Sequence, residues 1–137
     1  MKVIKYLLLV VLSSVLLSSC ATGPPTKIEL ESADYGSSIT QNEAQKLAEK
    51  FLYQHLKDPY SAKCNWSNVY KGWLREAIIN GSGLIFGYIL DVDVNAKNSY
   101  GGYVGIKKYH FVFYNGSIKT VYGPKEMDGR SYMGKIY

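Results

Sequence analysis

Apolar positions beyond residue 40 first recur with a helical period. From Ala44 to Leu56 they lie three and four residues apart, with polar residues between them. Thr40 and Glu43 have the spacing of a capping box, in which each side chain accepts a hydrogen bond from the backbone N–H of the other residue. Pro59 ends the pattern, because the residue before a proline is driven out of helical geometry. The spacing predicts an amphipathic helix from about Gln41 to Leu56 that buries one face.

After Pro59 the period changes to two, with β-branched and aromatic residues alternating with polar ones. The clearest strand runs from Leu84 to Asn95, and its even-numbered residues form the predicted core face. The next strand runs from about Tyr103 to Tyr114, and Asn115-Gly116 favours a two-residue hairpin turn into a strand from Ser117 to Tyr122. The segment from Ala62 to Ile79 is interpreted as one long strand, or as two strands joined by a bend at Lys71-Gly72.

These elements predict an α+β fold, with one N-terminal amphipathic helix packed on an antiparallel meander of about four strands. We assign them to a single domain over residues 40–137. Residues 20–39 are rich in Gly, Pro, Ser and Thr, a composition typical of a flexible linker. A flexible chain of about twenty residues spans roughly 25 Å.

The N-terminal pattern is that of a secretory signal peptide. Two lysines lie within the first five residues, and Tyr6 to Leu17 is an apolar run broken only by Ser13 and Ser14. Twelve helical residues reach only about 18 Å, short of the roughly 30 Å hydrocarbon core of a bilayer. A permanent transmembrane helix is therefore the poorer interpretation of residues 1–19.

Leu17-Ser18-Ser19-Cys20 resembles the lipobox of bacterial lipoproteins. The resemblance implies cleavage before Cys20, a thioether-linked lipid on its sulfur and an acyl chain such as palmitate on the new amino terminus. Such chains together make release from the bilayer negligible. Ala21 stands where the sorting pattern of these proteins has an Asp for retention at the inner membrane. The resemblance therefore implies a lipid anchor in the outer membrane, with the domain facing the periplasm.

Charge and cysteine content narrow the partners further. Removal of residues 1–19 takes away Lys2 and Lys5 and leaves fourteen basic against eleven acidic residues, a net charge of +3. This excess is scattered, so we expect no nucleic-acid partner. With Cys20 lipidated, Cys64 is the remaining thiol and is interpreted as a small buried residue. His55 and His110 have no ligand spacing around them, so neither a zinc site nor a cofactor is expected.

Asp91 and Asp93 lie on one face of the predicted strand, an arrangement that suggests a cation site or an acid/base pair. In a register where paired residue numbers sum to about 198, Asp91 instead faces Lys107, and the charge is matched across strands. His110 then shares the core face as a half-buried residue. Because no Ser/His/Asp or Cys/His arrangement occurs, we expect a protein without enzymatic activity, and a hydrolase that uses either aspartate is a third-ranked alternative.

The stretch from Asn95 to Gly105 concentrates Asn, Ser and Gly between two predicted strands. Together with Asp58-Pro59-Tyr60-Ser61-Ala62-Lys63 it resembles a family of small bacterial envelope and phage-borne proteins that carry both segments, a resemblance that implies no activity. The stretch is either only a demanding turn, or a recognition loop. In the second interpretation its contact residues are Asn95, Lys97, Asn98, Tyr100 and Tyr103.

Thirteen tyrosines are many for this length, and the odd-numbered sheet face would carry Ile85, Ile89, Tyr109, Phe111 and Phe113. Either this face is an exposed partner surface, with Tyr109 and Phe111 as contacts, or another segment covers it. The leading hypothesis is a membrane-anchored envelope lipoprotein that acts as a non-enzymatic binding module for another envelope component, most readily a protein. The alternative is an inhibitor or phage exclusion factor that acts on a cell-wall hydrolase or receptor.

Overall fold

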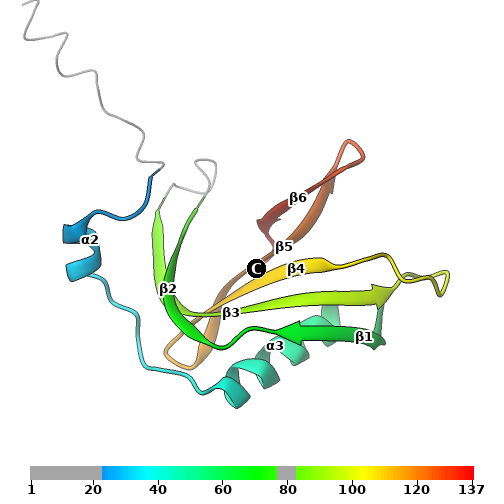
Figure 1. The fold of residues 1–137 in the computed structure, drawn as a ribbon, viewed down its shortest axis with the longest axis horizontal. Coiled ribbons are helices and arrows are strands. Elements are labelled where there is room, and N and C mark those ends of the chain that lie inside the picture. The colour runs from blue at the N-terminus through cyan, green and yellow to red at the C-terminus, as the bar shows by residue number, and fades with distance from the viewer. Residues whose placement is uncertain (1–22, 77–82) are drawn as a thin grey trace, which may run out of the picture.

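A computed structural model of the chain describes residues 23–76 and 83–137. In this part the strands are β1 (Asp58–Trp66), β2 (Tyr70–Arg75), β3 (Leu84–Lys97), β4 (Lys107–Tyr114), β5 (Ser117–Met127) and β6 (Arg130–Lys135), and the helices are α2 (Lys27–Glu31) and α3 (Gln41–His55). The strands form one curved antiparallel sheet, and α3 lies along one of its faces (Figure 1). The predicted signal peptide and Cys20 lie outside the described residues.

Helix α3 begins where the sequence predicts it. Thr40 Oγ1 accepts a hydrogen bond from Glu43 N at 3.3 Å, and the Glu43 carboxylate accepts one from Thr40 N at 3.1 Å, so the capping box is complete. The helix buries Ala44, Ala48, Phe51 and Leu52 against the sheet. The rings of Phe51 and Phe111 meet edge to face with centroids 5.5 Å apart. This contact places the centre of the core between α3 and β4.

Strand β3 is the centre of the sheet, because β1 and β2 both pair with one of its edges and β4 pairs with the other. In its second half the buried residues are even-numbered, from Leu90 to Ala96, and face α3. In its first half Ile85 and Ile89 are buried on the opposite face, in a second cluster with Val112. The predicted even-numbered core face therefore holds only for the half of β3 that α3 covers.

The predicted fold class is wrong. The sheet has six strands instead of about four, strand residues dominate the described chain, and a second helix precedes the amphipathic one. Two elements account for the difference. The segment after Pro59 forms two separate strands, interrupted at residues 67–69 instead of at Lys71-Gly72. The chain beyond Tyr122 continues β5 and returns as β6 through a turn in which Asp128 and Gly129 both have positive φ.

The predicted register between β3 and β4 is also wrong: paired residue numbers sum to 201 instead of about 198, an odd shift that changes the face of every side chain. Val92 pairs with Tyr109, Leu90 with Phe111 and Asp91 with His110, so odd-numbered residues of β4 share a face with even-numbered residues of β3. A shift of one residue moves every side chain of a strand to the other face. Tyr109 and Phe111 are therefore buried beneath α3, at 7% and 0% exposure, instead of lying on an open partner surface.

The segment predicted to be a flexible linker touches the sheet at separate points, although α2 itself buries no residue. Helix α2 has its own capping box at Thr26, and the Arg75 Nε group donates a hydrogen bond to the Gly23 carbonyl oxygen at 2.9 Å. The Tyr35 ring meets the Phe86 ring edge to face at 5.3 Å, with Lys71 Nζ 4.1 Å from its centroid. Residues 35–39 thus contact the sheet and end in the core at Ile39, whereas most of residues 23–33 are exposed. No helix in the described ranges combines the length and hydrophobicity that a bilayer crossing requires.

Candidate functional site

The two sequence segments that carry the family resemblance meet at one end of the sheet. Asp58 pairs with Lys97, and Ser61 Oγ accepts a hydrogen bond from Lys97 N at 2.8 Å while donating one to the Asp58 carbonyl oxygen at 2.8 Å. Tyr103 closes the arrangement, since its hydroxyl donates to the Ser61 carbonyl oxygen at 3.3 Å. The start of β1 therefore holds the chain at Lys97, where β3 ends, and again at Tyr103 within the loop that follows.

The loop of residues 98–106 organises itself around Asn98. Asn98 Oδ1 accepts hydrogen bonds from Tyr100 N at 2.9 Å and from Gly102 N at 3.1 Å, and Asn98 N donates to the Gly102 carbonyl oxygen at 2.9 Å. Gly101 and Gly105 supply positive φ angles of 82° and 88°. These contacts explain the Asn and Gly residues of this stretch as turn-forming. These contacts involve the backbone of Tyr100 but not its side chain, which is 96% exposed.

Exposed large side chains gather at this end of the molecule, which we call the loop end: the end of α3, the start of β1 and the loop of residues 98–106, on the right in Figure 1. The Tyr53 and Tyr60 hydroxyls are hydrogen-bonded to each other. Among the described residues, six exposed large hydrophobic side chains lie here: Tyr53, Tyr60, Tyr100, Tyr103, Val104 and Ile106. A cluster of exposed apolar side chains in one region marks an interaction surface more than scattered ones do.

Lysines accompany these side chains. Two ammonium groups lie near the Tyr103 ring, with Lys63 Nζ 4.9 Å and Lys97 Nζ 5.5 Å from its centroid. A cation at this distance is attracted to the ring face. Lys107 forms a loose ion pair with Glu126, 3.9 Å between charged atoms, and the Glu126 side chain is mostly exposed. The loop end thus combines exposed aromatic rings with a surplus of positive charge.

A pocket of about 370 Å³ lies beside the loop end, which we call the helix-end pocket. It forms because α3 stops at His55 while the strands beneath it continue. Its lining comes from the end of the helix, three strands and the loop: His55, Leu56, Lys57, Val94, Ala96, Lys97, Asn98, Val104, Lys107, Tyr109, Pro124 and Glu126. The pocket joins a floor made of buried core residues to a rim of lysines.

The structure brings together four of the predicted contact residues, Lys97, Asn98, Tyr100 and Tyr103. Asn95 lies two residues before Lys97 on the face of the sheet opposite α3, where it lines a smaller pocket of about 250 Å³ with Lys63. Its buried Oδ1 atom has no hydrogen-bond partner within the described part of the chain. Tyr109 and Phe111 belong to the core, as described above. Cys20 lies outside the described residues.

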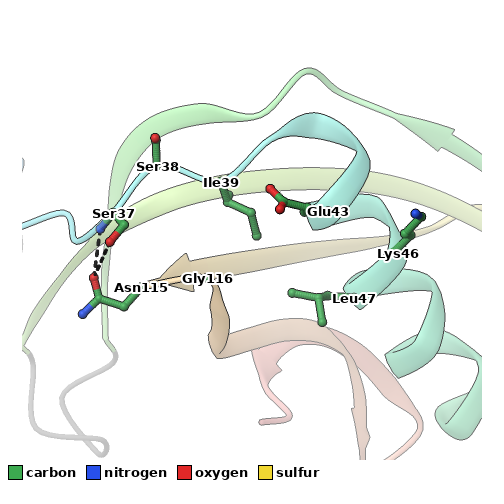
Figure 2. A pocket seen from close by; sticks show the side chains of 8 residues that line it. All are labelled: Ser37, Ser38, Ile39, Glu43, Lys46, Leu47, Asn115 and Gly116. Carbon is green, nitrogen blue, oxygen red and sulfur yellow. Dashed lines mark hydrogen bonds between the residues drawn. The ribbon is translucent and has the colours of Figure 1, made fainter.

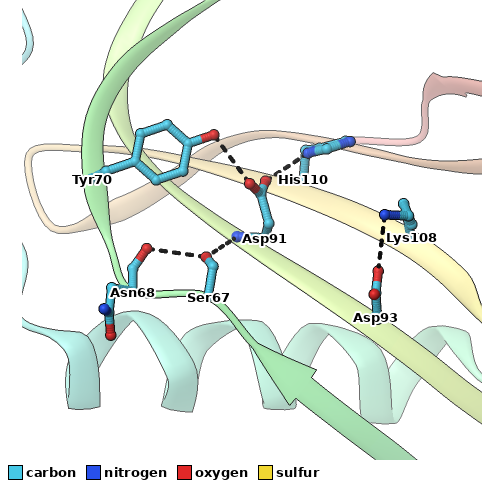
Figure 3. Close-up of polar contacts among 7 residues, drawn as sticks. All are labelled: Ser67, Asn68, Tyr70, Asp91, Asp93, Lys108 and His110. Atoms are coloured by element: carbon cyan, nitrogen blue, oxygen red, sulfur yellow. Dashed lines mark hydrogen bonds and ion pairs between the residues drawn. The ribbon is translucent and has the colours of Figure 1, made fainter.

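The face of the sheet opposite α3 carries a polar group centred on Asp91 (Figure 3). Its carboxylate lies 2.6 Å from His110 Nδ1 and accepts a hydrogen bond from the Tyr70 hydroxyl at 3.1 Å. Asp91 N donates to Ser67 Oγ at 2.9 Å, and Asp93 forms an ion pair with Lys108 at 3.7 Å. Both aspartates are thus matched across strands, Asp91 by His110 instead of the predicted Lys107, and Asp93 by Lys108.

These contacts change the acidity of the groups involved. Partial burial by itself would raise the pKa of the Asp91 carboxyl, but the hydrogen bond from His110 and the positive charge beside it outweigh burial and bring the pKa below its usual value. Burial and the negative charge of Asp91 raise the pKa of Tyr70 to about 12. Tyr70 is therefore a hydroxyl donor at neutral pH, and Asp91 is an anion.

The polar group continues across the sheet to β6. Tyr122 pairs with His110, Lys135 pairs with Tyr122, and Lys135 Nζ donates to the Glu76 carboxylate at 2.8 Å. Glu76 follows β2, so this ion pair links the two outer parts of the curved sheet. The Tyr122 hydroxyl is buried without a partner among the described residues, and burial followed by the charge of Glu76 raises its pKa. The ion pair holds the curvature of this face.

A further pocket of about 460 Å³ lies at the start of α3, between Ser37, Leu47 and the β4–β5 turn (Figure 2). Asn115 Oδ1 accepts hydrogen bonds from both Ser37 N, at 2.9 Å, and Ser37 Oγ, at 3.2 Å. Asn115 has a φ of 50°, which the type I′ turn requires. The two hydrogen bonds between Ser37 and Asn115 attach the segment before α3 to the hairpin, and Glu43 is engaged in the capping box with Thr40.

Several residues of the loop end were not predicted from the sequence. Tyr60 and Ser61 belong to a motif that the sequence displays, but a motif assigns no role to its members. Val104 and Ile106 follow a glycine-rich stretch and were assigned to the next strand, which in fact begins at Lys107. On the opposite face, the contact of Tyr70 with Asp91 could not be predicted either, because it depends on where β1 ends and β2 begins.

Neither metal ligands nor known proteins point to an activity. In residues 23–76 and 83–137, no three His, Cys, Asp or Glu side chains are placed to hold a metal ion. Cys64 is half-buried, and burial followed by the charge of Glu49 raises the pKa of its thiol, so it is a weak nucleophile at neutral pH. No protein-family model, no curated protein and no solved structure matches this chain.

Proposed function

We propose that this chain is a non-enzymatic binding module of the bacterial envelope, anchored by lipid on Cys20 in the outer membrane and facing the periplasm. The lipid anchor is proposed from the lipobox resemblance of Leu17 to Cys20. The binding role is proposed from the loop end, where exposed aromatic and aliphatic side chains lie on a framework of internal hydrogen bonds. A rigid surface of this kind binds without first losing conformational freedom.

The observation that carries the proposal is the exposure of Tyr100 and Ile106, at 96% and 68%, on a loop whose backbone is internally bonded. Nothing in the loop requires these side chains for folding. The Asp91 group, in contrast, is accounted for by cross-strand pairing, with each charged atom matched by a neighbour. The loop end is therefore the better candidate for contact with another envelope component.

Site-specific photo-crosslinking in intact cells tests this role. Benzoylphenylalanine in place of Ile106 is expected to give a crosslinked product with one envelope component. The matched control is the same amino acid in place of Ile28, which is 77% exposed on α2 at the other end of the molecule (Figure 1). The control position is expected to give no such product.

Substitution then tests the contact residues. In the chain that carries the crosslinker at position 106, Tyr100→Ala combined with Tyr103→Ala should remove the product. Tyr132→Ala is the control, because Tyr132 on β6 is as exposed as Tyr103, at 45%, but lies away from the loop. A product that survives the double substitution, or that forms equally from position 28, contradicts the proposed site.

A further inference from the structure

The rim of the helix-end pocket consists mainly of hydrogen-bond donors. Three lysines line it, Lys57, Lys97 and Lys107, against the single carboxylate of Glu126. The ammonium group of Lys97 lies over the Tyr103 ring, which is outside the lining, so Lys57 and Lys107 remain to supply the positive charge. Each ammonium group has three donors and no acceptor. Glu126 is mostly exposed and only loosely paired, at 3.9 Å from Lys107, so it neutralises little of this charge. The rim therefore suits an anionic ligand that is rich in acceptors.

Asn98 adds donors at a defined position. Its Oδ1 atom is held by the backbone N–H groups of Tyr100 and Gly102, at 2.9 and 3.1 Å. The nitrogen of the same carboxamide lies on the other side of the group and carries two N–H donors. Asn98 lines the helix-end pocket, and the loop contacts of its side chain use only the oxygen of the carboxamide.

The floor and the size of the pocket limit the rest of the ligand. Val94, Ala96 and Tyr109 are at most 7% exposed, so the floor is part of the apolar core. The volume of about 370 Å³ would hold about a dozen water molecules at roughly 30 Å³ each, which lies near the lower end of ligand pockets. This is the size of about two small amino-acid residues. A long acyl chain requires an enclosed apolar channel, and a bilayer surface cannot enter a recess.

We infer that the helix-end pocket binds the C-terminal carboxylate of a partner polypeptide whose last residue is small and aliphatic. The carboxylate meets the ammonium groups of Lys57 and Lys107 and the amide of Asn98, and the aliphatic side chain lies on the floor formed by Val94 and Ala96. The inference rests on the proposed function, because it specifies the partner chemistry at the loop end.

Fluorescence anisotropy with the full-length chain in detergent tests the pocket. The probe is a fluorescein-labelled hexapeptide that ends in alanyl-valine with a free carboxylate. A peptide of the same sequence with an amidated C-terminus, and one whose last two residues are D-amino acids, are the comparison ligands. Loss of a hydrogen-bonded charge is expected to weaken binding of the amide about tenfold or more.

Variants connect the binding to the pocket. Lys57→Gln combined with Lys107→Gln should weaken binding of the free-acid probe by about the same factor and should abolish the preference for the acid over the amide. Lys50→Gln is the matched control, since Lys50 is exposed on α3 and does not line the pocket. It should bind the probe as the unsubstituted chain does.

Two results would overturn the inference directly: equal affinity for the acid and the amide, or no saturable binding of the free-acid probe. A preference for the D-peptide would also overturn it, because the natural ligand would then not be the end of a protein chain. These results are separable from the proposed function. If the crosslink from position 106 persists while the peptide experiments fail, only the pocket inference falls. If that crosslink also fails, the loop end is not the binding surface.

Discussion

Ser61 connects the two motif segments by hydrogen bonds, so its substitution tests how the loop end is stabilised. Ser61→Ala deletes the acceptor for Lys97 N and the donor to the Asp58 carbonyl oxygen, both at 2.8 Å. One such bond contributes about 1 kcal/mol net, and a partly buried N–H left without an acceptor costs about 1 kcal/mol more. We therefore expect the free energy of unfolding to fall by about 2 kcal/mol.

Urea denaturation of the variant measures this loss, and amide hydrogen exchange shows where it occurs. The exchange of the Lys97 amide should accelerate more than that of the core of β4. Ser99→Ala is the matched control, because Ser99 is exposed in the loop, and its substitution should change stability by less than about 0.5 kcal/mol. If Ser61→Ala is no more destabilising than Ser99→Ala, or if the Lys97 amide remains protected, the two segments do not depend on this serine.

Three further predictions concern the core, the sheet and its charges. Phe111→Ala should lower the free energy of unfolding by about 3–5 kcal/mol and Tyr100→Ala by less than about 0.5 kcal/mol, because the two side chains are 0% and 96% exposed; similar urea midpoints for both variants would contradict the register of β4. Gly87→Ala should destabilise the fold by about 1–3 kcal/mol or prevent it, since a Cβ there would lie 2.4 Å from a backbone oxygen of β4, and a thermal midpoint equal to that of the unsubstituted chain would refute this contact. The pKa of Asp91 is lowered in the folded state, so its contribution to stability is present above the unfolded value of about 3.9 and is lost as the pH falls through the lower folded value. Asp91→Asn should therefore show a smaller loss of stability on acidification than the unsubstituted chain, and identical pH profiles in urea would show that the pairing with His110 does not stabilise the fold.

Elements with a local signal were predictable. The helix start follows from the spacing of Thr40 and Glu43, and the β4–β5 turn follows from Asn115-Gly116, whose φ angles of 50° and 73° only such residues adopt readily. The β5–β6 turn has the same chemistry at Asp128-Gly129, with φ angles of 52° and 73°. It escaped prediction because the residues on either side are mostly exposed and mix polar with apolar side chains, so no alternating apolar pattern identified the strands.

The register between β3 and β4 was not predictable from pattern, because both faces of the sheet bury apolar residues. Ile89 is buried on one face and Leu90 on the other, so the sequence of β3 does not say which face receives the helix. The same holds for β4, where Phe111 and Val112 lie in different clusters. Register then depends on the length and shape of the loop of residues 98–106, which only the folded contacts of Asn98 define.

The loop end was predictable in part. Unusual composition identified Lys97, Asn98, Tyr100 and Tyr103, since a run of Asn and Gly between strands indicates a special backbone. It could not identify Tyr60, which lies at the same end only because Asp58 pairs with Lys97. The prediction of Tyr109 and Phe111 as surface contacts was wrong for a different reason. Aromatic side chains suit a core as well as a surface, and the strand register alone decides on which face of the sheet these two lie.

The hydrogen bond from Arg75 to the Gly23 carbonyl oxygen limits how the domain can move if Cys20 carries lipid as proposed. Only about three residues, a span of roughly 10 Å, then separate the acylated cysteine from chain that is fixed to the sheet. Strand β3, with 14 residues, leads from the neighbourhood of Arg75 to the loop end over a contour of up to about 45 Å. Together these lengths would keep the loop end within roughly 55 Å of the lipid anchor, so partners would be met close to the membrane.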